Sequence, residues 1–123
     1  MQTLGHVQVI AIPLINLTPK KGKDIKELGP PRAFLSSVGP YIGDDRDSFD
    51  EENVVSAEVE EGRPGGTFYV YELANPYAKY AAHSVAALSI RGDVAFLVEA
   101  SATEAQWRSS EPVLRSVVNS FTV

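Results

Sequence analysis

The sequence predicts an α+β fold in which an antiparallel β-sheet is covered by helices. Two turn sequences, at residues 63–66 and at Gly92-Asp93, each lie between segments of strand-forming residues. A row of apolar residues between Val113 and Phe121 has the spacing of a helix that covers a sheet. A chain of 123 residues is long enough to bury a core without disulfides, so we expect one domain, residues 1–123.

The composition excludes several classes of protein. No apolar run approaches the roughly 20 residues that a membrane-spanning helix needs. The chain has no cysteine, which excludes disulfides, thiolate chemistry and zinc fingers. Its net charge of −5 disfavours nucleic acid as a partner, because binding phosphates requires clustered lysine and arginine. The one dense basic run contains Lys20, Lys21 and Lys23.

The N-terminal part predicts a strand, a loop and a short helix. Residues 7–17 are almost continuously apolar and β-branched, which favours a buried strand, although Pro13 indicates an edge position or a bulge. Residues 18–29 are polar and lysine-rich, as in a loop. A helix is then expected to begin at Pro30-Pro31 and to end at Gly39-Pro40.

An acidic segment follows this helix. It has neither the glycine nor the spacing of an EF-hand. Its negative charge is able to attract a basic partner or a cation, and the alternative is a solvated loop. Six of the nine residues from 44 to 52 are acidic: Asp44, Asp45, Asp47, Asp50, Glu51 and Glu52.

Two hairpins follow in the sequence. Residues 54–60 alternate, with Val55, Ala57 and Val59 on one face, and the turn at 63–66 leads into a strand over 67–73. The glycine-first turn Gly92-Asp93 pairs Arg91 with Val94, so the numbers of opposed residues sum to 185.

The register of this second hairpin places it inside the sheet. Ala87 opposes Val98 on one face, whereas Leu88 opposes Leu97 on the other. Because both faces carry apolar residues, both are expected to be covered.

The last element is a helix. The residues Ser109-Ser110-Glu111-Pro112 predict its cap and first turn. One apolar stripe is expected to face the sheet, formed by Val113, Leu114, Val117, Val118 and Phe121.

The motifs indicate a protein that is not an enzyme. The two histidines, His6 and His83, lie in no hydrolase or metalloprotease motif, and the sequence has no phosphate loop or dinucleotide fingerprint. We therefore expect no catalytic residues.

The hairpin register does bring one pair of functional groups together. His83 opposes Ala102, and Glu104 has the same side-chain parity two residues further on, which predicts a Cα separation of roughly 7 Å. Such a pair is able to share a divalent ion (calcium, manganese or zinc) or to act as a pH-sensitive pair; the alternative is an ordinary surface histidine. A metal would need a third ligand, from the acidic segment or a neighbouring molecule, and no cofactor is otherwise required.

These residues resemble the PsbP family of thylakoid-lumen proteins. The family pattern of strand, tight turn, strand, acidic residue, Trp and helix is similar to this chain at Glu104-Ala105-Gln106-Trp107 and Ser120-Phe121-Thr122-Val123. Upstream, the resemblance continues at Leu28-Gly29-Pro30 and Phe34-Leu35. The details, including an alanine-rich segment at 77–87, look most like the divergent PsbP-domain and PsbP-like proteins.

The resemblance implies an α/β/α sandwich, with a central antiparallel sheet between a short helix from the N-terminal half and the C-terminal helix. It also implies an extrinsic protein of the chloroplast thylakoid lumen, or of the lumenal side of the cyanobacterial thylakoid, peripheral and not inserted in the membrane. Such a protein docks to a photosynthetic complex and assists its assembly, stability or ion retention. Photosystem II with its oxygen-evolving complex is the first expectation; photosystem I and the NAD(P)H dehydrogenase-like complex are the alternatives.

The resemblance bears on the candidate site and on assembly as well. In the oxygen-evolving member, a histidine and an acidic residue at the places of His83 and Glu104 have been linked to divalent-ion binding. The chain begins after the family's flexible leader and first hairpin, which predicts a possible strand-swapped dimer or a partner that supplies strands.

Overall fold

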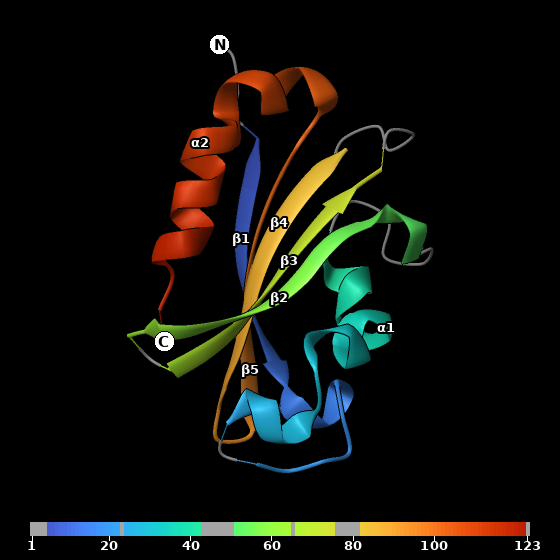
Figure 1. The fold of residues 1–123 in the computed structure, drawn as a ribbon, viewed down its shortest axis with the longest axis vertical. Helices are drawn as coiled ribbons and strands as arrows, with labels where there is room; N and C mark the ends of the chain where they lie inside the picture. Colours follow the sequence, from blue (N-terminus) through green and yellow to red (C-terminus); the bar gives the residue numbers. More distant parts are fainter. Residues whose placement is uncertain (1–4, 23, 43–50, 65, 76–81, 123) are drawn as a thin grey trace.

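The described residues form a five-stranded antiparallel sheet with helical segments on both faces, as the computed structural model shows (Figure 1). The structure describes residues 5–22, 24–42, 51–64, 66–75 and 82–122. The strand order is β1-β5-β4-β3-β2. The strands are β1 (His6–Pro13), β2 (Val54–Arg63), β3 (Gly66–Ala74), β4 (His83–Arg91) and β5 (Val94–Ala102), and the α-helices are α1 (Leu35–Val38) and α2 (Glu104–Ser120).

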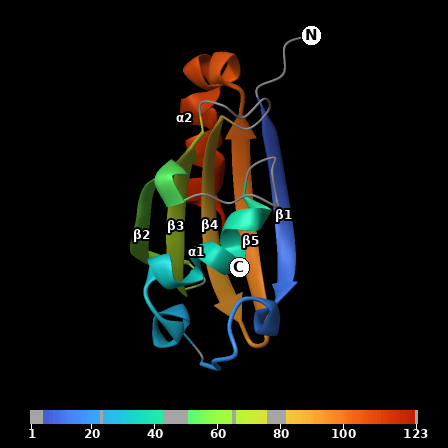
Figure 2. The ribbon, with the colours of Figure 1, turned by 90° about the vertical axis from the view of Figure 1, so that its right-hand side faces the viewer.

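The layers match the fold that the sequence predicted. In Figure 1, α2 lies on one side of the sheet and α1 on the other, and Figure 2 shows the sheet between them, with β1 and β2 at its two edges. The α+β class and the α/β/α sandwich are therefore confirmed. Within the described part of the chain, no helix is both long enough and apolar enough to span a bilayer.

Strand β1 is shorter than predicted. It ends at Pro13, and the chain turns at once into a 3-10 helix, η1 (Leu14–Asn16). This turn is fixed because the Leu14 N–H donates to the carbonyl oxygen of Asp93 at 2.8 Å. The edge position indicated by Pro13 is confirmed, since a proline on an edge strand removes no hydrogen bond from the ladder.

The helix predicted after Pro30-Pro31 is a single α-helical turn between two 3-10 turns. The segment η3 (Pro31–Phe34) leads into α1, and η4 (Gly39–Tyr41) follows it. Within the predicted loop, η2 (Ile25–Leu28) is stabilised by a capping box between Asp24 and Glu27.

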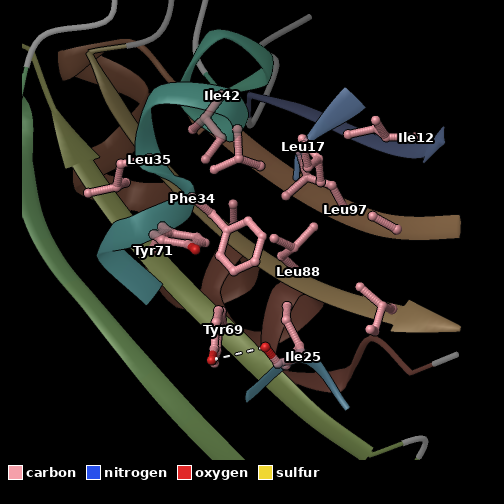
Figure 3. Close-up of a cluster of buried hydrophobic side chains, with 14 of the residues drawn as sticks. Ile12, Leu17, Ile25, Phe34, Leu35, Ile42, Tyr69, Tyr71, Leu88 and Leu97 are labelled. Atoms are coloured by element: carbon pink, nitrogen blue, oxygen red, sulfur yellow. Dashed lines mark hydrogen bonds between the residues drawn. The ribbon is translucent and has the colours of Figure 1, made fainter. Parts of the chain in front are cut away.

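Two tyrosines of β3 attach this layer to the sheet. The Tyr71 hydroxyl donates to the carbonyl oxygen of Pro31 at 2.8 Å. The Tyr69 hydroxyl donates to the carbonyl oxygen of Ile25 at 3.3 Å (Figure 3). Tyr69 also bonds to the carbonyl oxygen of Gly29. Burial raises the pKa of both phenols, so they remain neutral donors over the physiological range.

Each face of the sheet carries its own core, as the register of the second hairpin predicted. Leu88 and Leu97 are paired and fully buried on the α1 side, among the side chains drawn in Figure 3. Ala87 and Val98 are paired on the α2 side and contribute to the second core. The sum of 185 holds along the whole hairpin, from Arg91 and Val94 to His83 and Ala102.

The face predicted for β2 is wrong in part. A register shift between Val54 and Ser56 breaks the simple alternation, so Val54 and Ala57 pack against the α1-side core. Val55 is left 55% exposed. Val59 is also 45% exposed, because β2 is an edge strand.

Helix α2 begins earlier than predicted. It starts at Glu104 rather than near Ser109, and Pro112 lies inside it. Proline removes the hydrogen bond to the fourth residue before it, and α2 changes direction after its first turns (Figure 1). The residues that α2 buries are Trp107, Ser110, Leu114 and Val118.

The apolar stripe predicted for this helix is therefore only partly correct. Leu114 and Val118 are buried, but Val113 and Val117 are 49% and 37% exposed. Val113 and Val117 each precede a buried residue by one position. Neighbouring residues of a helix are rotated by about 100° around its axis, so these two side chains point away from the sheet.

Candidate functional site

His83 and Glu104 are brought together where β4 begins and α2 begins. The hairpin register places His83 opposite Ala102, the last residue of β5, and α2 starts two residues later. The His83 Nε2 atom lies 2.8 Å from Oε2 of Glu104. The pairing predicted from the sequence is therefore confirmed as a direct contact. Glu104, however, lies in the first helical turn and not in a continued strand.

A capping box fixes the position of Glu104. The Thr103 hydroxyl accepts from the Gln106 N–H at 3.1 Å, and the Gln106 side chain accepts from the Thr103 N–H at 3.0 Å. The pattern Thr-x-x-Gln is the signature of such a box, so the sequence did contain the signal for this helix start. A carboxylate in the first turn is also favoured by the helix dipole.

Trp107 holds the His83 ring in place. The two rings stack with centroids 5.0 Å apart and planes 5° from parallel. Trp107 follows Glu104 by three residues, so both side chains lie on one side of the first helical turn. Trp107 itself is 8% exposed and belongs to the α2-side core, which gives the imidazole a rigid base.

Arg115 supports Trp107 from the next turns of α2. Its guanidinium carbon lies 5.3 Å from the centroid of the Trp107 ring. The guanidinium forms ion pairs with Glu72 of β3 and with Glu111, whose Oε2 lies 2.7 Å from Nε. The hydrogen bond to Glu72, with the one to Glu111, raises the pKa of Arg115, so the cation is fixed against the sheet.

The site is exposed on one side and packed on the other. The His83 side chain is 22% exposed, whereas that of Glu104 is 62% exposed. Zinc bonds of about 2.0–2.2 Å at a tetrahedral angle require the two ligand atoms to be about 3.4 Å apart. A change of about 0.6 Å from the observed 2.8 Å is within reach of the exposed Glu104 side chain.

Two side chains of residue types that bind metals, His83 and Glu104, meet at this point. Among the described residues, no group of three or more His, Cys, Asp or Glu side chains is arranged to hold a metal ion. A bound cation would complete its coordination with water or with a group from a partner. In that arrangement the site would bind an ion at a surface rather than enclose it.

The acidic segment is only partly within the described residues. Asp44, Asp45, Asp47 and Asp50 lie outside them. Glu51 and Glu52 belong to η5 (Glu51–Asn53), immediately before β2.

The described end of this segment does not join the histidine site. Val54 pairs with Leu73 of β3, and Leu73 pairs with Ser84 of β4, so η5 lies at the His83 end of the sheet. Two strand spacings separate them, which is about 10 Å.

Comparisons with known proteins agree with the fold. The family model described as PsbP matches residues 3–123. The PsbP domain-containing protein 6, chloroplastic, of Arabidopsis thaliana is 36% identical over 117 residues, which cover 95% of this chain and 44% of that protein. The chain therefore spans less than half the length of this relative.

A solved structure has the same fold. The solution structure of cyanobacterial PsbP from Synechocystis sp. PCC 6803 superposes with a TM-score of 0.58 at 17% identity, over 95% of this chain and 66% of that one. At this identity the likeness concerns the fold.

Proposed function

The chain belongs to the PsbP family, and from this membership we propose that it is a non-catalytic peripheral protein of the thylakoid lumen that docks to a photosynthetic complex. Photosystem II is the first candidate. Its role there would be to assist assembly, stability or ion retention. The lumenal side of the cyanobacterial thylakoid is the equivalent location.

The observation that carries this proposal is the match of the family model over residues 3–123, together with 36% identity to a chloroplastic PsbP-domain protein. The acidic segment supports docking to a basic surface, because Glu51 and Glu52 end a run of six acidic residues at one end of the sheet.

Docking predicts retention on purified photosystem II membranes at low salt. Because exposed charges are screened within about 8 Å at physiological ionic strength, rising salt is expected to release the protein. The measurement is the fraction retained after washing, with membranes enriched in photosystem I or in the NAD(P)H dehydrogenase-like complex tested in parallel. Retention on either of these instead would identify the partner, and no retention on any of them would contradict the proposal.

A matched pair of variants tests the acidic segment. Glu51→Gln/Glu52→Gln is expected to reduce retention, whereas Glu58→Gln/Glu61→Gln, with the same charge change along β2, is expected to leave it unchanged. Glu61 pairs with Lys26 only at the exposed surface, so this control costs little stability. Equal losses of retention in both variants would show that retention depends on the net charge of the protein and not on the position of Glu51 and Glu52.

The second candidate function is divalent-cation binding by His83 and Glu104. The 2.8 Å contact and the stacking of His83 on Trp107 support it, because a pre-positioned imidazole loses little freedom when it binds an ion. The ion would link the protein to a partner or regulate its docking.

Titration with calcium, manganese and zinc tests this candidate. Trp107 is the only tryptophan and lies against His83, so its fluorescence is expected to change as the site fills. His83→Ala is expected to weaken binding at least about tenfold, as loss of even an outer-shell partner does.

His6→Ala is the control for the metal titration, because His6 is exposed and belongs to the edge strand β1. Its register partner is Ser101, whereas that of His83 is Ala102, so the two histidines point to opposite faces of the sheet. The metal role is excluded by the absence of saturation with all three ions, or by binding that His83→Ala leaves intact.

A further inference from the structure

We draw no further inference here: the strongest candidate, the apolar surface on the α2 side of the sheet that exposes Val7 and Val9 of the edge strand β1 together with Val113 and Val117 of α2, carries nothing because, among the residues that the structure describes, nothing shows what covers it.

Discussion

Replacing Arg63 with alanine is expected to lower the free energy of unfolding by about 3 kcal/mol, because two charged hydrogen bonds to carbonyl groups, one buried and one partly buried, are lost. Arg63 ends β2, and its side chain is only 4% exposed. The Nη1 atom donates to the carbonyl oxygens of Val118 at 2.9 Å and Phe121 at 3.1 Å. These groups are at the C-terminal end of α2, so one side chain joins the first hairpin to the last helix.

The last turn of α2 supplies no cation of its own at this end. This turn contains no basic residue, and Phe121 at its end has an extended backbone rather than the left-handed one of a glycine cap. The guanidinium therefore satisfies the terminal carbonyls and opposes the negative end of the helix dipole. It also lies 4.5 Å from the centroid of the Phe68 ring and is held by Glu60 at 2.7 Å.

Urea unfolding measures this loss, and two variants show its origin. Arg63→Lys keeps the charge but loses the planar fork whose Nε and Nη2 bind Glu60 while Nη1 binds both carbonyls, so it is expected to lose less than Arg63→Ala. Glu60→Gln removes a partner that is 42% exposed, and a loss below about 1 kcal/mol is expected. A loss for Arg63→Ala no larger than that for Glu60→Gln would contradict the assigned role.

The parts of the fold that follow from local rules were predicted well from the sequence. A two-residue turn with glycine first fixes the register of its hairpin, and Gly92 does adopt a positive φ of 61°. The register set by that turn was sufficient to predict the two apolar faces of the hairpin and the approach of His83 to Glu104. Both are properties of one hairpin and of strand alternation.

One local signal was missed, and the tertiary contacts were not predicted. The start of α2 was placed at the expected cap and first turn, Ser109 to Pro112, although Thr103 and Gln106 form a capping box upstream. Burial of Trp107 and Leu114 against the sheet stabilises the first turns in spite of the proline. The Arg115 contact with Glu72 joins residues from different elements, and no local pattern encodes it.

Replacing Trp107 with alanine is expected to lower the free energy of unfolding by about 3 kcal/mol and to release the His83 ring. The loss follows from removal of a large side chain that is 8% exposed and belongs to the α2-side core. Without the stacked indole, His83 keeps only its contact with the exposed Glu104. Trp107→Phe keeps a ring beneath the imidazole, and a smaller loss is expected.

Leu114→Ala separates these two effects. Leu114 is 3% exposed in the same core, and its truncation is expected to cost about 2–3 kcal/mol. The hydrogen bond and the ring stacking of His83 are with Glu104 and Trp107, so this truncation leaves both partners in place. Calorimetry of both variants gives the stability loss, and NMR of the His83 ring reports its surroundings. If Leu114→Ala shifts the His83 resonances as much as Trp107→Ala does, the site responds to core stability in general. Because loss of the indole ring current alone shifts the His83 resonances, positioning is read from cation affinity: if the indole positions the imidazole, any affinity found for His83 and Glu104 should fall in Trp107→Ala and not in Leu114→Ala.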